Sequence, residues 1–386
     1  MKILAVSHAC ITDVNQQLYV ELNKISGNDV TLCVPATWRS EYSTDLIRAR
    51  VLPDVTFSIE RLPVNLPGNI NMHFYKSGIN RLLTTTKPDV LFIDEEPWSL
   101  AAAQWLQLSR KYKVPAVVYT MQNIYKQYPF PFNLLEQRCY KTAQSIPVLN
   151  DEARAVLKRK GFQGDAPYLP LGCDLTLFHS DRTKRAVVPG LTGVVLGYMG
   201  RLVPDKGVDT LIEAAAILLS RDPNLDFSLL IVGAGAEEEK LRSLANAKLK
   251  TGTAMFTGSV PHNQAGDYMR AMDVFVLCSR TRPNWKEQFG RVIVEAMATG
   301  TPVVGSNSGE IPVLINLTGG GMIFEEGNAS SLADCLISLI QDAGRRAELG
   351  ETGQRCVRSQ FTHTAVAFTL NCILHDAVVN ATTGRA

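Results

Sequence analysis

The chain has 386 residues, a length that suits two domains, each large enough to bury a core of its own. Hydrophobic residues make up 46% and charged residues 20%, which is typical of a soluble globular enzyme, and the net charge of +2 excludes a strongly basic nucleic-acid-binding surface. The eight cysteines are scattered without a CxxC pair, so we expect free core thiols and a cytoplasmic protein.

The N-terminal half alternates apolar runs with helical stretches. The runs expected to form strands are Ile3–Val6, Val30–Val34, Val90–Ile93, Ala116–Tyr119 and Ile146–Val148. This alternation predicts an α/β domain with a parallel sheet covered on both faces, in which ligands lie beyond the carboxyl ends of the strands. The apolar start of the chain is too short for a signal peptide, and no apolar run is expected to cross a bilayer.

Polar residues follow several of these strands. Gln122 and Asn123 carry both donors and acceptors, which suits neutral sugar hydroxyls. Asp13, after the first strand, could face the hydroxyls of an acceptor, although an ordinary loop residue explains it as well. His8 ends the first strand and is interpreted as a packed or solvated residue rather than a catalyst.

Two further features of this half have a structural interpretation that we favour. The acids of Asp94–Glu96 precede Pro97 and are expected to cap a helix rather than to contact an acceptor. The stretches Phe74–Leu83 and Ala153–Lys160 mix basic and apolar residues, as membrane-surface helices do. A solvated helix face with an apolar side toward the core is the favoured alternative for both.

Residues 179–190 are polar and unpatterned and predict the boundary between the two domains. We place an N-terminal domain at residues 1–180, a C-terminal domain at 190–357 and a final helical segment at 358–386. The strands expected in the second domain are Gly193–Met199, Leu229–Val232, Val274–Leu277 and Pro302–Val304.

The stretch Leu277–Leu314 carries the clearest indication of a ligand. A helix is expected to start near Phe289, and the first-turn N–H groups of Phe289, Gly290 and Arg291 would then face an anion such as a phosphate. The absence of a side chain at Gly290 would let that anion approach the backbone.

Charged residues surround this helix start. Glu295, one to two turns into the helix, could accept hydrogen bonds from both hydroxyls of a ribose, and Glu287, ahead of it, from a second polyol. Arg201 and Lys206 lie between a strand and the next helix, where two cations suit a diphosphate. The residues alone leave ordinary alternatives open, because acids favour helix starts and basic residues are common on loops.

The segment EQFGRVIVEAMATGTPVVGSNSGEIP resembles the E-x7-E signature of retaining glycosyltransferases of family 4, which have the two-domain GT-B fold. Glu287 and Glu295 fall on its two acidic positions, and GRLVPDKG resembles the phosphate-binding segment of that family. The resemblance implies an α/β chain of two Rossmann-like parallel-sheet domains that face each other across a cleft. It implies catalytic roles for Arg201, Lys206 and Glu287, and a donor site formed by Gly200, Ser259, Val260, Phe289, Gly290, Arg291 and Glu295.

The N-terminal half departs from the family pattern in two places. The loop HACITDVNQQ lacks the Gly-Gly pair of many relatives, and Gln122–Asn123 stands near the place where the family often has a histidine. The helical stretch Phe361–Val379 is expected to cross back onto the first domain, as the terminal helix does in the family.

The implied function is transfer of a hexose from a nucleotide diphosphate-sugar, with UDP and GDP as the first candidates, to an acceptor hydroxyl in glycan, polysaccharide or glycolipid synthesis. The anomeric configuration would be retained. Without an Asp-x-Asp motif, neither a metal nor another cofactor is expected. We expect no nucleic-acid partner, and an acceptor bound by the N-terminal domain. A lipid-linked acceptor and contact with the inner face of the membrane stay open. The alternatives are a sugar-nucleotide epimerase or phosphorylase of the same architecture, and a non-catalytic scaffold that binds nucleotide-sugars.

Overall fold

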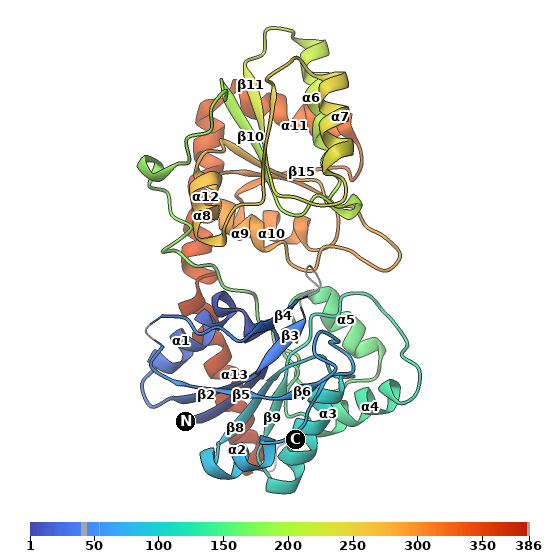
Figure 1. Ribbon diagram of the computed structural model, residues 1–386, viewed down its shortest axis with the longest axis vertical. Helices are drawn as coiled ribbons and strands as arrows, with labels where there is room; N and C mark the ends of the chain where they lie inside the picture. Colours follow the sequence, from blue (N-terminus) through green and yellow to red (C-terminus); the bar gives the residue numbers. More distant parts are fainter. Residues whose placement is uncertain (40–44, 54, 384–386) are drawn as a thin grey trace. The chain divides into compact units, whose positions relative to one another are not determined.

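The computed structural model describes residues 1–39, 45–53 and 55–383 (Figure 1). Contacts divide the chain into unit 1, which comprises Met1–Gly172 and His363–Ala386, and unit 2, which is Cys173–Thr362. The sequence placed these divisions at 180–190 and at 357–358. The structure moves the first boundary to Gly172–Cys173 and the second to Thr362–His363. The N–H of Cys173 donates to the carbonyl of Phe361 at 2.7 Å, which ties the start of unit 2 to its end.

Unit 1 is built on a five-stranded parallel sheet in the order β5-β2-β1-β8-β9. Its strands are β1 (Lys2–Ser7), β2 (Asp29–Pro35), β5 (Ser58–Leu62), β8 (Val90–Asp94) and β9 (Ala116–Val118). The central strands β1 and β8 are almost wholly buried, as expected for a sheet covered on both faces. Along the chain, strands are added on one side of β1, as β2 and β5, and then on its other side, as β8 and β9.

Helices cover both faces of this sheet. They are α1 (Gln17–Lys24), α2 (Ile79–Thr86), α3 (Leu100–Tyr112), α4 (Phe132–Thr142), α5 (Asp151–Arg159) and α13 (His363–Thr383). In Figure 1, α13 is drawn in red among the blue and teal elements of unit 1, and it packs against α1. The small elements are the pairs β3 (Thr37–Arg39) with β4 (Leu46–Arg48) and β6 (Val64–Asn65) with β7 (Phe74–Tyr75), and the 3-10 turns η1 (Ala9–Ile11) and η2 (Asp13–Gln16).

Four of the five strands predicted for this half form. The fifth prediction, Ile146–Val148, is wrong, because residues around it make only isolated bridges, such as Val148 with Tyr168. The sequence also missed β5, whose side chains are mostly exposed at the sheet edge and therefore lack the apolar run that marks a buried strand.

The two stretches considered for membrane contact turn their apolar side chains inward. Leu82 and Leu83 of α2 are buried, and so are Val156 and Leu157 of α5. The favoured interpretation of solvated helix faces is confirmed for these residues. Phe74, at the start of the first stretch, belongs to strand β7 and not to a helix.

Unit 2 is built on a six-stranded parallel sheet in the order β12-β11-β10-β13-β14-β15. Its strands are β10 (Val194–Met199), β11 (Phe227–Val232), β12 (Ala254–Gly258), β13 (Val274–Leu277), β14 (Val303–Ser306) and β15 (Gly321–Phe324). This is the doubly wound order in which two halves run outward from the first and fourth strands. The predicted class, two α/β domains with Rossmann-like parallel sheets, is confirmed.

The helices of unit 2 pack in two groups, as they do when both faces of a sheet are covered. One group is α6 (Val208–Arg221), α7 (Glu238–Lys248) and α11 (Ala329–Gln341). The other is α8 (His262–Arg270), α9 (Arg291–Ala298), α10 (Ile311–Thr318) and α12 (Ala343–Gln360). Two 3-10 turns, η3 (Arg182–Lys184) and η4 (Pro204–Lys206), complete the unit.

By length and composition, α13 is the one helix within the described ranges that could cross a membrane, where the sequence analysis expected none. Core helices pass the same test. Val366, Leu370 and Leu374 are buried, and Asn371 accepts a 2.8 Å hydrogen bond from Asn28 near α1. These contacts account for the apolar side of α13 within unit 1.

Candidate functional site

The strand order of unit 2 identifies one place for a ligand. The strand order reverses between the neighbouring parallel strands β10 and β13. In doubly wound sheets the loops after two such strands diverge, and ligands bind in the crevice between them. The loop after β10 carries GRLVPDKG, and the loop after β13 carries Glu287. The two segments singled out in the sequence therefore belong to the same crevice.

Lys206 and Glu287 meet there in an ion pair. The Lys206 Nζ lies 2.6 Å from Glu287 Oε2, and the two side chains are only 15% and 12% exposed. The same carboxylate oxygen accepts a hydrogen bond from the Ser279 hydroxyl at 2.9 Å. The Lys206 ammonium also lies 4.9 Å from the centre of the Trp285 ring. A cation and an anion, 81 residues apart in sequence, are thus fixed at one point of the crevice.

The turn after β14 holds the backbone of Glu287. The N–H of Glu310 donates to the Glu287 carbonyl at 3.1 Å. Gly309 has φ of +54°, and a Cβ at this position would lie 2.2 Å from that carbonyl oxygen. Only glycine allows both the backbone angle and this approach. The segments after three neighbouring strands of the sheet, β10, β13 and β14, therefore contribute to the position of Glu287.

Helix α9 starts later than predicted. It begins at Arg291 and not at Phe289, because Gly290 takes a left-handed conformation with φ of +73° and forms the N-cap. The first-turn N–H of Ile293 already donates to the Gly290 carbonyl at 2.8 Å. The Phe289 side chain is buried, so only its backbone could reach a ligand.

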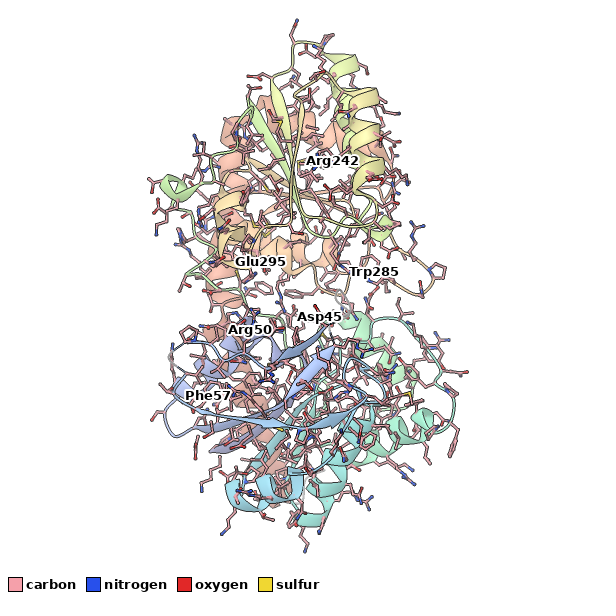
Figure 2. The ribbon with its side chains drawn as sticks, in the orientation of Figure 1. Asp45, Arg50, Phe57, Arg242, Trp285 and Glu295 are labelled. Carbon is pink, nitrogen blue, oxygen red and sulfur yellow. The ribbon has the colours of Figure 1, made fainter. Side chains whose placement is uncertain are left out.

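Glu295 lies on α9 and is 8% exposed. Burial raises the pKa of its carboxyl group to about 7, although Arg291 one turn earlier lowers it in part. Figure 2 labels Glu295 on α9 and Trp285 on the loop before that helix, both at the lower end of unit 2 in that view. A carboxyl group whose ionised form is disfavoured by burial in this way is a candidate functional residue.

The remaining donor residues follow the carboxyl ends of other strands of the same sheet. Gly200 and Arg201 directly follow β10, and the Arg201 side chain is exposed. The Arg201 carbonyl accepts a 2.7 Å hydrogen bond from the Tyr198 hydroxyl. Ser259 and Val260 follow the edge strand β12, which β11 separates from β10.

The three acceptor candidates all belong to unit 1. Asp13 starts η2, and its carboxylate accepts from the N–H of Val14 at 3.0 Å. The Gln122 amide is enclosed: its oxygen accepts from Lys160 Nζ at 3.0 Å, and its nitrogen donates to the Ile124 carbonyl at 3.1 Å. Asn123 donates to Glu152 at 3.2 Å. Both amides are buried and serve first to hold the segment after β9 in place.

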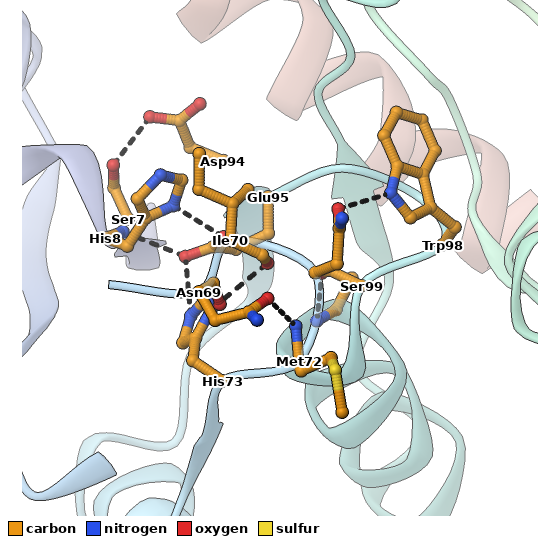
Figure 3. A network of polar contacts seen from close by, with 12 residues as sticks. Ser7, His8, Asn69, Ile70, Met72, His73, Asp94, Glu95, Trp98 and Ser99 are labelled. Carbon is orange, nitrogen blue, oxygen red and sulfur yellow. Dashed lines mark hydrogen bonds and ion pairs between the residues drawn. The ribbon is translucent and has the colours of Figure 1, made fainter. Parts of the chain in front are cut away.

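The interpretation of Asp94–Glu96 as helix-capping acids is wrong. Helix α3 is capped by Ser99, whose hydroxyl accepts from the N–H of Ala102. Glu95 is buried instead beside two histidines, and it binds His8 at 2.7 Å and lies 3.6 Å from His73 (Figure 3). The sequence offered a partial signal, because His8 and Glu95 both follow neighbouring strands. Nothing placed His73 there, since it comes from an irregular segment.

Comparisons with known proteins agree with this geometry. Residues 181–355 match the family described as Glycosyl transferases group 1. A stretch of 252 residues is 31% identical to a GDP-mannose-dependent monoacylated alpha-(1-6)-phosphatidylinositol monomannoside mannosyltransferase of Corynebacterium glutamicum, covering 62% of this chain and 65% of the relative. A D-inositol 3-phosphate glycosyltransferase of the same species is 28% identical, over 54% of this chain and 51% of the relative. The chain thus spans about half to two thirds of the length of these relatives.

Solved structures resemble the whole chain. A sucrose-phosphate synthase from Thermosynechococcus elongatus superposes with a TM-score of 0.73 and 20% identity, covering 98% of this chain and 99% of that one. Anabaena Alr3699/HepE in complex with UDP gives 0.75 and 17%, covering 97% and 100%. At these identities the likeness shows the fold, which is that of GT-B glycosyltransferases. The chain therefore resembles the glycosyl transferases group 1 family in sequence over residues 181–355, and GT-B glycosyltransferases in fold over its whole length.

Proposed function

We propose that this chain transfers a hexose from a nucleotide diphosphate-sugar to an acceptor hydroxyl, with the anomeric configuration retained. The observation that carries the proposal is the Lys206–Glu287 pair, at 2.6 Å, in the crevice between the loops that follow β10 and β13. Ligands of doubly wound sheets bind at this reversal of strand order. The pair belongs to the part of the chain that matches the group 1 family.

The donor would lie along unit 2 with its diphosphate at the reversal point. Lys206 supplies a fixed cation there, and Arg201, exposed beside Gly200, supplies a second. The N-terminal end of α9, with Gly290 as its cap, adds a partial positive charge. These groups together would bind a diphosphate without a metal ion.

The two glutamates would hold the sugars on either side of the diphosphate. Glu287 is assigned to the transferred hexose, because its carboxylate is already fixed by Lys206 and Ser279. Glu295 is assigned to the ribose, whose two hydroxyls could both donate to one carboxylate. Main-chain atoms at Ser259 and Val260 are assigned to the base. Relatives named for GDP-mannose and a neighbour in complex with UDP make both bases candidates.

In the reaction, the bond between the anomeric carbon and the diphosphate oxygen breaks, and the acceptor oxygen forms a new bond on the same face of the sugar. The negative charge that develops on the leaving diphosphate is stabilised by Lys206, Arg201 and the start of α9. The leaving oxygen takes the acceptor proton, so no separate general base is needed. This accounts for retention without a covalent sugar–enzyme intermediate.

The acceptor is assigned to unit 1, where Asp13, Gln122 and Asn123 lie in segments that follow strands of the sheet. Since Gln122 and Asn123 are engaged in internal hydrogen bonds, we assign them a positioning role and Asp13 a direct one. The curated relatives named above act on a phosphatidylinositol mannoside or an inositol phosphate, according to their names. A polyol on a glycolipid is therefore the acceptor class that we propose, which would bring the chain to a membrane surface.

The test is release of nucleoside diphosphate from UDP- and GDP-sugars, with and without a polyol acceptor, followed by product analysis. We expect nucleoside diphosphate to be released only when an acceptor is present, and the product to keep the anomeric configuration of the donor sugar. Glu287→Gln should abolish both the release and the product. Conversion of the donor sugar without an acceptor would indicate an epimerase, and dependence on inorganic phosphate a phosphorylase. Nucleotide binding without any turnover would indicate a scaffold.

A further inference from the structure

A second polar cluster lies in unit 1, at the carboxyl ends of β1 and β8, where the strand order of that sheet reverses. It consists of His8, His73 and Glu95, whose potential ligand atoms all lie within 4.8 Å of one another (Figure 3). His73 and Glu95 are 0% and 2% exposed, while the His8 side chain is 19% exposed. The transfer reaction proposed for unit 2 uses none of them.

The hydrogen bonds of His73 fix which ring nitrogen is available. Its Nδ1 lies 3.1 and 3.2 Å from the carbonyl oxygens of Asn69 and Ile70. Carbonyls only accept, so Nδ1 carries the proton, and in the neutral ring Nε2 bears a lone pair. That Nε2 is buried and has no hydrogen-bond partner among the residues that the structure describes. A metal-binding histidine has this arrangement, with one nitrogen donating to a carbonyl and the other facing the ion.

The spacing of the ligand atoms also suits an ion. Two ligands on one tetrahedral zinc, with bonds of about 2.0–2.1 Å, lie roughly 3.3 Å apart. His73 Nε2 lies 3.6 Å from Glu95 Oε1, which is too long for a hydrogen bond and close to that value. His8 Nδ1 lies 2.7 Å from Glu95 Oε2, so a small rotation of His8, the most exposed of the three, would complete the site.

An aromatic side chain packs against both histidines of the cluster. Trp38 packs edge-on to the His73 ring at 4.8 Å between centroids and lies 5.1 Å from the His8 ring, which restricts both. Asp94 and Glu96 flank Glu95 in the sequence, and Asp94 accepts a 2.7 Å hydrogen bond from the Ser7 hydroxyl.

We propose that His8, His73 and Glu95 bind one divalent transition-metal ion of the zinc class. Two imidazoles and one carboxylate favour zinc, cobalt or iron(II) over magnesium, which prefers oxygen ligands. Three protein ligands leave a fourth position, on the side of the more exposed His8, for water or a hydroxyl. The site lies in unit 1 and is separate from the diphosphate site assigned to Lys206, so either can fail without the other.

The test is metal binding by the full chain after chelator treatment, measured by equilibrium dialysis against Zn²⁺ and by the ligand-field absorption of Co²⁺. We expect one equivalent bound, quenching of Trp38 fluorescence by Co²⁺, and a spectrum without thiolate charge-transfer bands. His8→Gln, His73→Gln and Glu95→Gln should each weaken binding at least about 100-fold, since each removes one ligand. His8→Gln changes the least buried group and is the variant expected to fold.

The matched control is His375→Gln. His375 is exposed on α13 and lies one turn from the exposed Cys372, the pair that would bind zinc adventitiously. The proposal expects this variant to bind like the wild type. It is overturned if the wild-type chain binds no zinc at micromolar concentrations, or if His8→Gln and Glu95→Gln bind as the wild type does while His375→Gln does not.

Discussion

Replacing Glu295 with glutamine should increase the stability of unit 2 and weaken the binding of a nucleotide-sugar. The side chain is 8% exposed, and burial raises the pKa of its carboxyl group from 4.5 to about 7. The folded state therefore disfavours the charged form. Glutamine has the same size and no charge to desolvate, so the substitution removes the cost while it keeps the packing.

The magnitude follows from the two pKa values. Each pKa unit corresponds to about 1.4 kcal/mol, so the shift of Glu295 costs unit 2 about 3 kcal/mol above pH 7. Below pH 4.5 the carboxyl group is protonated in both states and the cost vanishes; it grows as the pH rises from 4.5 to 7. For a unit of this size, about 3 kcal/mol corresponds to a rise in Tm of roughly 6–12 °C.

The assay is thermal unfolding of wild type and Glu295→Gln between pH 4.5 and 8.5, with nucleotide-sugar binding measured at pH 8. We expect equal Tm values at the acid end, a growing advantage for the variant toward pH 7, and an affinity loss of about tenfold, because a charged acceptor holds ribose hydroxyls more strongly than an amide. A variant that is less stable at pH 8, or a difference that does not change with pH, would refute the reasoning.

Three further predictions concern the same crevice. Lys206→Met leaves Glu287 without its counter-charge, so unit 2 should lose about 2 kcal/mol in chemical denaturation and turnover should fall at least about 100-fold, whereas Lys240→Met, in an exposed ion pair of similar length, should change neither. Gly309→Ala forces a Cβ to within 2.2 Å of the Glu287 carbonyl and should cost about 1–3 kcal/mol more than Gly327→Ala, where φ is also positive but nothing lies within 4 Å. Equal losses for the two glycines would contradict the packing described. Turnover should persist in EDTA; complete loss that magnesium restores would contradict a diphosphate site without a metal, while restoration by zinc alone would point to the His8 cluster.

The sequence predicted structure correctly where a local pattern of residues has a single structural explanation. The buried strands were predicted because apolar runs between turn residues have few other uses, and β13 has the bounds expected from its four apolar residues. That Lys206 and Glu287 act in one site was expected only through family resemblance, because 81 residues separate the two in sequence; their direct ion pair was not predicted. The pairing of β10 with β13 is what brings them together.

The predictions that failed depended on contacts from distant segments. Asp94–Glu96 looked like helix-capping acids because the long-range partners of Glu95, which are His8 and His73, cannot be inferred from local sequence. The start of α9 was placed two residues early because Gly290 was interpreted only as an opening for an anion. Its left-handed conformation also makes it the N-cap, and that depends on how the preceding loop packs.

Binding of nucleoside diphosphates by wild type and Lys206→Met, measured by calorimetry, tests the central claim most directly. The claim is that the crevice between the β10 and β13 loops grips a pyrophosphate. We predict that UDP or GDP binds the wild type and that the variant binds the same nucleotide at least about tenfold more weakly, a loss of about 1.4 kcal/mol or more, while uridine and guanosine are unaffected. Equal affinity of the two proteins for the diphosphate, or no binding of either nucleotide by the wild type, would contradict it.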